Sequence, residues 1–157
     1  MTHPRSPEEK LAALGYTLPH LPSAGGNYVS AKRNGEVLYL SGVISIGADG
    51  VITGTAGADR GVDEGYAAAR ACALTQLAVL KQVLGSLDRV AEVLSVNGYV
   101  HAAPGFADSP AVINGASDLL VQIFGDAGRH VRAAVGVSAL PRNALAEIQM
   151  TVKVKEP

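Results

Sequence analysis

Residues 131–154, VRAAVGVSALPRNALAEIQMTVKV, contain two predicted strands, 131–137 and 144–154. The second strand alternates, and its apolar residues are Ala146, Ile148, Met150, Val152 and Val154. This period of two places the apolar side chains on one face of a sheet and the polar ones, which begin with Glu147, on the other. If these two strands form a hairpin that turns near Leu140-Pro141, Val137 pairs with Ala144.

Two helices and a third strand are predicted before this segment. Apolar residues recur at three- and four-residue steps over 63–84, and Gly85 can end that helix. Its alanine-rich first half indicates a close approach to a sheet. A second helix begins at Ser109-Pro110 and ends before Gly125, and residues 93–101 form a strand between the helices. This order predicts an α+β fold, with a mixed sheet that carries two helices on one face.

The chain is predicted to consist of an N-terminal helix with its linker, residues 1–24, and a main domain, residues 25–157. The chain as a whole is predicted to be a single domain. Ser6-Pro7-Glu8-Glu9 begins the helix, because serine can cap it, proline suits its first turn and Glu9 can reach back to the cap. Residues 17–27 contain prolines and glycines and are predicted to be irregular.

Two turns follow the linker. Asn34-Gly35 lies between the strand-like runs 28–32 and 37–41, which is typical of a tight hairpin. Asp49-Gly50 marks a second turn, between strand-like residues 43–46 and 51–53. The segment from Gly54 to Gly61 is predicted to be a flexible loop, since no Lys-Ser/Thr follows its glycines to hold a phosphate.

Composition excludes several classes of protein. Thirteen basic and fourteen acidic residues among 157 give a formal charge of -1, so no global positive field attracts nucleic acid. With no Trp, five Tyr and two Phe, a broad stacking platform for single strands is not expected. No segment resembles a signal peptide or a membrane span, which predicts a cytoplasmic protein without a membrane partner.

Metal and thiol chemistry are not expected either. The only cysteine, Cys72, excludes an internal disulfide, and its alanine-rich helix predicts a buried, inert thiol. The four histidines lack the spacing of metal ligands, although His130 precedes Arg132 by two residues and can share its strand face. No cofactor motif is present.

Arg132 and Glu147 are the candidate catalytic pair. Arg132 shares a strand face with Ala134 and Gly136, whose small side chains leave space for a ligand carboxylate beside the guanidinium. In the predicted hairpin Ala134 lies opposite Glu147. Arg132 is then the diagonal neighbour of Glu147, with about 7–8 Å between their backbones, and the two side chains can bridge that distance. A surface ion pair, or two independent surface charges, is the alternative reading.

The C-terminal residues and four positions elsewhere in the chain resemble a known family. Residues 130–137, Leu140-Pro141 and Glu147 resemble the C-terminal signature of the RidA family, also called the YjgF or L-PSP endoribonuclease-like family. Tyr28, Ser41-Gly42 and Asn114 fall where the site residues of that family fall, although each can equally be structural. The resemblance covers about residues 25–155, and the N-terminal helix is similar to that of a longer bacterial subgroup.

The resemblance implies a fold, an assembly and a reaction. The fold is chorismate-mutase-like, and the assembly is a homotrimer with ligand sites in the clefts between subunits. The reaction is the hydrolysis of 2-enamino or 2-imino acids, such as 2-aminoacrylate, to 2-keto acids and ammonia, without a cofactor. Arg132 would then bind the substrate carboxylate and Glu147 would act on the water. Tyr28, Ser41, Gly42, Asn114 and Ala134 would form the rest of the substrate site.

Two departures from the family pattern keep other functions open. Many deaminases of the family have cysteine where this chain has Ala134, and residues 102–109 form a longer loop that can reshape the cleft. A non-catalytic trimer that binds a small carboxylate is therefore an alternative. An endoribonuclease or translation inhibitor is a third reading, which the near-neutral charge disfavours.

Overall fold

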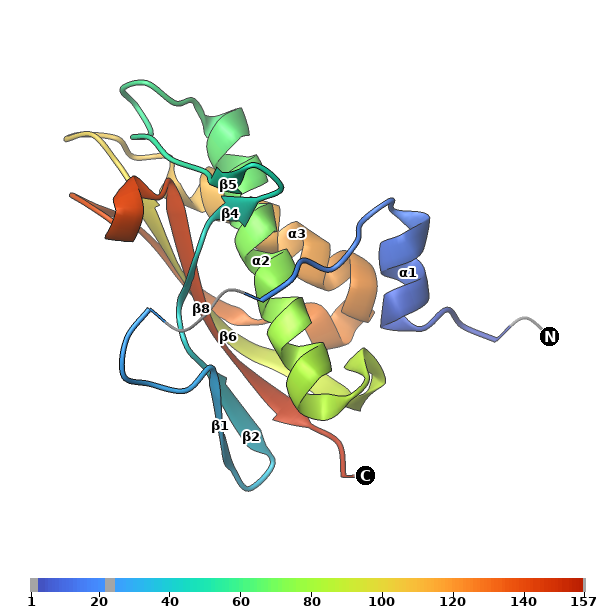
Figure 1. The fold of residues 1–157 in the computed structure, drawn as a ribbon. Helices are drawn as coiled ribbons and strands as arrows, with labels where there is room; N and C mark the ends of the chain where they lie inside the picture. The colour runs from blue at the N-terminus through green and yellow to red at the C-terminus, as the bar shows by residue number, and fades with distance from the viewer. Residues whose placement is uncertain (1–2, 22–24, 157) are drawn as a thin grey trace.

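The computed structural model describes residues 3–21 and 25–156 (Figure 1). Residues 22–24 of the predicted linker lie outside the described residues. The helices are α1 (Pro7–Ala13), α2 (Val62–Leu84) and α3 (Ser109–Phe124), with 3-10 turns η1 (Leu87–Arg89), η2 (Gly125–Gly128) and η3 (Pro141–Asn143). The strands are β1 (Ala31–Asn34), β2 (Val37–Leu40), β3 (Val43–Ile44), β4 (Ile46–Gly47), β5 (Gly50–Val51), β6 (Val90–His101), β7 (Val131–Val137) and β8 (Ala146–Val154).

The main sheet has the order β1-β2-β8-β6-β7, and β3 also pairs with β8. Only the β6–β7 pair is parallel in this sheet; its other pairs are antiparallel. The connection between β6 and β7 passes through α3, as a parallel pair requires. Strands β4 and β5 form a separate small hairpin. The mixed sheet and the helices confirm the predicted α+β class.

Both long helices cover one face of the sheet, with α2 against β8 and α3 against β6 (Figure 1). The apolar face of β8 is fully buried beneath them, as its alternation predicts. The helices also approach one another closely, because a Cβ on Gly65 would meet Val112 at 2.9 Å and a Cβ on Gly115 would overlap the backbone of Tyr66. The alanine-rich half of α2 therefore serves a helix contact as well as a sheet contact.

The predicted hairpin of the last two strands is wrong. Strand β6 lies between β7 and β8, and Gly98 is opposite both Ala134 and Ile148. The alternation of β8 specifies which face is buried, but it does not specify which strand is the neighbour. Strand β6, which has 12 residues and apolar side chains on one face, pairs with β7 along one edge and with β8 along the other.

The first hairpin is confirmed, with its turn moved by one residue. Asn34 pairs with Val37, so the two turn residues are Gly35 and Glu36. Gly35 has φ 63°, which a two-residue turn with glycine at its first position requires. The strand before the turn begins at Ala31, so Tyr28 precedes the sheet instead of lying within it.

Helix α1 begins as predicted and packs against α3 and η1. The Ser6 hydroxyl accepts a hydrogen bond from the Glu9 N–H, and the Glu9 carboxylate accepts one from the Ser6 N–H. Leu11 is the buried residue of this helix. The Glu8 carboxylate accepts the N–H of Leu87 at 2.7 Å, so it ties α1 to the main domain.

Replacing Glu8 by Gln tests this attachment. Partial burial alone would raise the pKa of Glu8, but the Leu87 N–H and the nearby Lys81 lower it below its ordinary value. A lowered folded-state pKa contributes stability above the unfolded pKa of about 4.3, and that contribution is lost as the pH falls through the folded value. We expect Glu8→Gln to reduce the free energy of unfolding at pH 7 by about 1 kcal/mol, after allowing for solvent screening.

The measurement is urea denaturation at pH 7 and at pH 3, with Glu9→Gln as the matched control on the same helix. The difference between wild type and Glu8→Gln should shrink at the lower pH. An equal difference at both pH values would contradict a role for the Glu8 charge.

In the part of the chain that the structure describes, no helix is both long and apolar enough to cross a membrane.

Candidate functional site

A cleft of about 410 Å³ opens beside the middle of the sheet. Its wall includes three of the predicted site residues, Tyr28, Gly42 and Glu147. The other lining residues are Gly25, Val43, Ile44, Ile46, Thr75, Pro141 and Arg142. The cleft therefore combines a mostly apolar wall with one carboxylate, one phenol and one guanidinium.

Glu147 lies on the face of the sheet that the helices leave uncovered. It pairs with Ile44 on one side and Tyr99 on the other, and its side chain is half-buried. Burial raises the pKa of the Glu147 carboxyl group above its ordinary value. Among residues 3–21 and 25–156, no side chain forms a hydrogen bond or an ion pair with this carboxylate. It is therefore available to exchange a proton with a bound molecule or a water.

An irregularity in the sheet brings Gly42 against Glu147. Tyr39 pairs with Thr151 and Val43 pairs with Ile148, so the chain between β2 and β3 contains one residue more than β8 does opposite it. This is the arrangement of a β-bulge, which re-aims the chain locally. As a result, a Cβ on Gly42 would lie 2.7 Å from Oε2 of Glu147.

Two glutamines hold this bulge. The Gln76 amide, fully buried on α2, donates to the carbonyl oxygens of Ser41 at 2.9 Å and Ile148 at 3.1 Å. Gln149 donates from β8 to the carbonyl oxygen of Leu40 at 3.0 Å. Carbonyl groups that the bulge removes from the strand ladder are thereby satisfied. Sequence reasoning missed Gln76, although a glutamine on the apolar face of a predicted helix is a signal of such a role.

Replacing Gly42 by Ala tests whether the carboxylate needs this space. The added methyl group must displace Glu147, because 2.7 Å is closer than a Cβ contact allows. We expect at least a tenfold loss of any activity that depends on Glu147, since misplacing a catalytic group by about 1 Å is costly. Gly61→Ala is the control, because a Cβ there has nothing within 4 Å. Equal activities of the two variants would contradict the close fit at Gly42.

Ser41 precedes Gly42 and bonds to the segment that leads into β1. Its hydroxyl donates to the carbonyl oxygen of Val29 at 2.6 Å, and its N–H donates to the carbonyl oxygen of Ser30 at 2.9 Å. Both bonds hold the segment that carries Tyr28. The Tyr28 side chain is half-exposed, and its hydroxyl accepts the N–H of Gly25 at 3.1 Å. Ser41 therefore positions the segment that carries Tyr28, and its contact with a substrate stays a prediction.

Arg132 belongs to a second group, on the other side of the sheet. It pairs with Val96, which is buried under the helices, whereas Glu147 lies on the uncovered face. The predicted contact between Arg132 and Glu147 within one chain is therefore wrong. The error follows from the hairpin, because β6 separates the two strands.

Asn114 and Ser117, both on α3, fix the Arg132 guanidinium. Its Nη1 donates to Oδ1 of Asn114 at 2.7 Å and to Oγ of Ser117 at 3.2 Å, while Nη2 contacts the Pro110 carbonyl oxygen at 3.4 Å. No carboxylate in the described part of the chain pairs with this exposed guanidinium. Because Nη1 is occupied, Nε and Nη2 are the pair of donors that suits a carboxylate. Asn114 is thus a positioning residue for Arg132.

Packed side chains occupy the space beside Ala134 and Gly136, the small neighbours of Arg132. Ala134 packs against the hydrophobic core. A Cβ on Gly136 would lie 3.0 Å from the Cβ of Ala102, so Ala102 occupies the space that the sequence seemed to offer a ligand. Neither Ala134 nor the predicted loop 102–109 lines the cleft.

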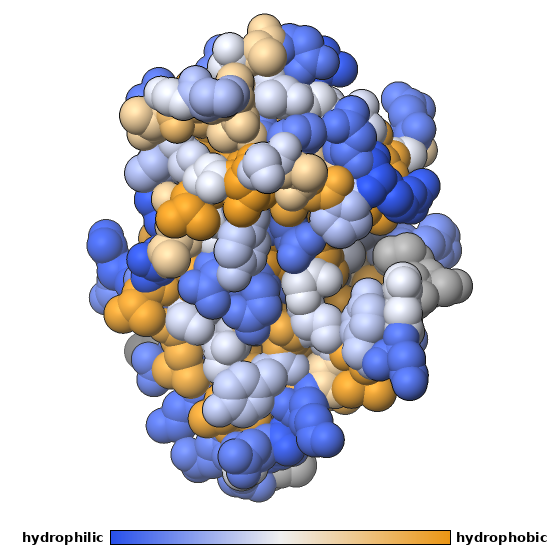
Figure 2. Space-filling view, turned by 90° about the vertical axis from the view of Figure 1, so that its left-hand side faces the viewer, coloured by the Kyte–Doolittle hydropathy of each residue, from blue (hydrophilic) through white to orange (hydrophobic). Residues whose placement is uncertain are grey.

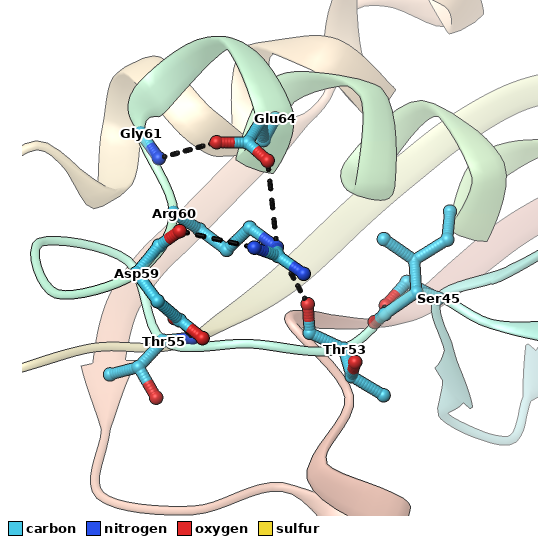
Figure 3. Close-up of polar contacts among 8 residues, drawn as sticks. Ser45, Thr53, Thr55, Asp59, Arg60, Gly61 and Glu64 are labelled. Atoms are coloured by element: carbon cyan, nitrogen blue, oxygen red, sulfur yellow. Dashed lines mark hydrogen bonds and ion pairs between the residues drawn. The ribbon is translucent and has the colours of Figure 1, made fainter.

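The glycine-rich loop 54–61 is held by polar contacts (Figure 3). Arg60 donates from Nε to the Thr53 carbonyl oxygen at 3.0 Å, and its side chain crosses over Gly54. The Thr55 N–H donates to Asp59, and the Gly61 N–H donates to Glu64. These contacts replace the flexible loop that was predicted. The Gly54 N–H in turn donates to the carbonyl oxygen of Asn143, next to Arg142 at the rim of the cleft.

The described residues contain no group of three or more His, Cys, Asp or Glu side chains that could hold a metal ion. Cys72 is buried, and burial raises the pKa of its thiol far above its ordinary range. This agrees with the inert thiol that the sequence predicts.

Large hydrophobic side chains are exposed on the uncovered face of the sheet. Figure 2 shows the side that carries the sheet in Figure 1, where hydrophobic and hydrophilic side chains are interspersed. On the uncovered face, Val131 is 73% exposed and Val135 is 47% exposed, and both belong to the edge strand β7. Tyr99 of β6 lies between Val135 and Glu147 in the sheet, so the valines and the carboxylate share the uncovered face without touching.

Comparison with known proteins gives one family. Residues 8–154 match the family model described as "YjgF/chorismate_mutase-like, putative endoribonuclease". Protein TCP17 of Trypanosoma cruzi is 42% identical over 146 residues, which cover 92% of this chain and 91% of TCP17.

Two crystal structures have the same fold along nearly the whole chain. Protein Atu1372 of Agrobacterium tumefaciens, whose function is unknown, has 39% identity and a TM-score of 0.88, with 96% of this chain and 94% of that chain covered. A protein of Shewanella oneidensis described as a putative endoribonuclease has 35% identity and a TM-score of 0.92, with 96% and 100% covered.

Proposed function

Because the chain belongs to the YjgF/chorismate mutase-like family, we propose that it hydrolyses reactive 2-enamino or 2-imino acids, such as 2-aminoacrylate, to 2-keto acids and ammonia. The observation that carries this proposal is the Glu147 carboxyl group. It lies in a cleft beside Gly42 and Tyr28, burial raises its pKa, and no described residue neutralises it. Such a group is suited to general acid–base work on a bound water.

The reaction needs little from the protein. Water adds to C2 of the imine while Glu147 takes the proton that the water loses. Glu147 then gives that proton to the carbinolamine nitrogen, the C–N bond breaks, and ammonia leaves while Glu147 takes the hydroxyl proton as the carbonyl forms. Since imines hydrolyse unaided, orientation of the water and of the substrate supplies most of the acceleration.

We propose that Arg132 of a second copy completes the cleft. In one chain Arg132 and Glu147 lie on opposite faces of the sheet, and neither has a partner of opposite charge among the described residues. The exposed valines of β7 offer a surface for association. A cyclic assembly that places the edge strand of one copy at the cleft of the next gives each substrate one carboxylate and one guanidinium. A homotrimer, the assembly of the family, meets this condition.

The remaining predicted residues then take distinct roles. Tyr28 and Gly42 face the substrate, whereas Ser41 and Asn114 hold Tyr28 and Arg132 in place. Ala134 lacks a side-chain donor, so its contribution is limited to its backbone. No cofactor is required.

The test is a coupled assay. A serine dehydratase generates 2-aminoacrylate, semicarbazide traps the imine that remains, and pyruvate formation is followed with and without this protein. We expect faster loss of the trappable imine, and we expect Arg132→Ala to abolish the acceleration. No acceleration by the folded, assembled protein would reject imine hydrolysis for this substrate. Saturable binding of pyruvate in that case would favour the non-catalytic carboxylate-binding alternative.

A further inference from the structure

A serine and a histidine meet at a separate surface pocket of about 230 Å³, between α3 and the start of β7. Its lining residues are Ser117, Val121, Arg129, His130 and Arg132. Oγ of Ser117 lies 2.9 Å from Nε2 of His130, and Nδ1 of His130 lies 2.7 Å from the carbonyl oxygen of Gly128. Within one chain none of these residues lines the Glu147 cleft, although Arg132 is the residue that we propose completes that cleft in a second copy.

The contacts assign the histidine tautomer. A carbonyl oxygen only accepts hydrogen bonds, so Nδ1 of His130 must carry the proton that Gly128 accepts. In the neutral ring Nε2 then has a lone pair, and the Ser117 hydroxyl is its donor. Burial lowers the pKa of His130, and the charge of Arg132 lowers it further although the Gly128 bond opposes both. The neutral, proton-accepting ring is therefore favoured at pH 7.

Positive charge surrounds the serine oxygen. Nη1 of Arg132 donates to Oγ of Ser117 at 3.2 Å, and Arg129 lines the same pocket. A hydrogen bond from a cation stabilises the negative charge that develops on the serine oxygen as its proton leaves. A nucleophile, a base in contact with it and a third group that orients the base are the three parts of an activated serine.

We propose that Ser117 is a nucleophile, with His130 as its general base, toward acyl compounds whose carboxylate is anchored by Arg132. Oγ of Ser117 attacks the carbonyl carbon of an ester while Nε2 of His130 takes the hydroxyl proton. The ester C–O bond then breaks, and the leaving alkoxide receives that proton from His130. Water, deprotonated by His130, finally releases the acid and restores Ser117.

The chain contains a second hydroxyl–imidazole contact that lacks these features. Oγ1 of Thr55 lies 3.4 Å from Nε2 of His101, and Nδ1 of His101 is buried with no partner among the described residues. The contact is longer and the ring has no orienting group. Thr55→Ala is therefore a matched control for Ser117→Ala.

The first experiment compares the protein-dependent cleavage of two esters of similar size, mono-4-nitrophenyl succinate and 4-nitrophenyl butyrate, by the full-length protein. The spontaneous hydrolysis of each ester, which is fast for the succinate because its own carboxylate attacks the ester carbonyl, is measured without protein and subtracted. We expect the succinate ester to be cleaved at least about tenfold faster, because Arg132 anchors its carboxylate. Ser117→Ala and His130→Gln should abolish the cleavage, Arg132→Ala should remove the preference for succinate, and Thr55→Ala should change neither. Mass spectrometry should find the acyl group on Ser117. Cleavage that survives Ser117→Ala, acylation of another residue, or no cleavage at all overturns the proposal.

A second experiment remains informative if the serine variants lose stability. Ser117→Cys introduces a thiol of similar size, and the buried Cys72 gives little background. Iodoacetate, which carries a carboxylate, should alkylate the introduced thiol about tenfold faster than neutral iodoacetamide, and adding Arg132→Ala should remove this difference. Equal rates with the two reagents overturn the role of Arg132 as the anchor. Both proposals use Arg132 as the carboxylate anchor, but neither experiment uses an imine and Glu147 takes no part in them, so a failure of this proposal can be distinguished from a failure of the proposed imine hydrolysis.

Discussion

Glu147→Gln is expected to lower the protein-dependent rate of 2-aminoacrylate hydrolysis by about 100-fold or more, the range for loss of a general acid or base. Glutamine keeps the shape of the side chain but cannot exchange a proton. The pH profile gives a second readout, because burial raises the pKa of Glu147. If Glu147 acts as the base, it must be ionised, and kcat/KM should fall as the pH decreases through a value above the ordinary 4.5.

The control is Glu92→Gln, on an exposed position of β6. This variant should retain the rate and the pH profile of the wild type. A Glu147→Gln protein with the wild-type rate would remove Glu147 from the mechanism. An acid limb that stays in Glu147→Gln would assign the titration to another group.

Mixing the inactive variants Arg132→Ala and Glu147→Gln is expected to restore imine hydrolysis. Arg132→Ala and Glu147→Gln each abolish the proposed site, but a site shared between copies needs only one intact residue from each. When the two variants are unfolded together and reassembled at equal amounts, about a quarter of the sites should contain both intact residues. Imine hydrolysis should therefore return to about a quarter of the wild-type value.

The control keeps both substitutions on one chain. The double variant, reassembled alone, has no intact site and should stay inactive. Reassembly of the two single variants without recovery of activity, although mixed oligomers are present by mass spectrometry, would contradict a site that two copies share. Activity recovered in proportion to mixing would at the same time establish an oligomer.

Local sequence patterns predicted most elements of this fold. The periodicity over 63–84 and the alternation after Ala146 identified α2 and β8, because each pattern reports which side of an element is buried. Neighbouring strands were not predictable in the same way. Strands β7 and β8 follow one another in sequence, but β6 separates them in space, and no local signal records that insertion.

For the candidate site too, the sequence indicated which residues matter but not which of them lie together. Arg132 and Glu147 were predicted to act together because they carry opposite charges. The distance between them depends on the order of the strands in the sheet, which the sequence does not specify. Ser41 and Asn114 were placed in the substrate site, but their hydrogen bonds go to the backbone near Tyr28 and to Arg132. The contact between Ser117 and His130 joins a helix to a strand entrance, so periodicity could not reveal it.

The position of β8 has a consequence for how the protein is made. This strand follows β7 in sequence, yet it pairs with β2, β3 and β6 and so holds the two halves of the sheet together. During synthesis, β2 and β6 therefore emerge from the ribosome without the strand that joins them. The nascent chain can form its helices early, because they are local, but its sheet closes only after β8 has emerged. A protein shortened at the C-terminus by one strand would lose the centre of its sheet and not an edge.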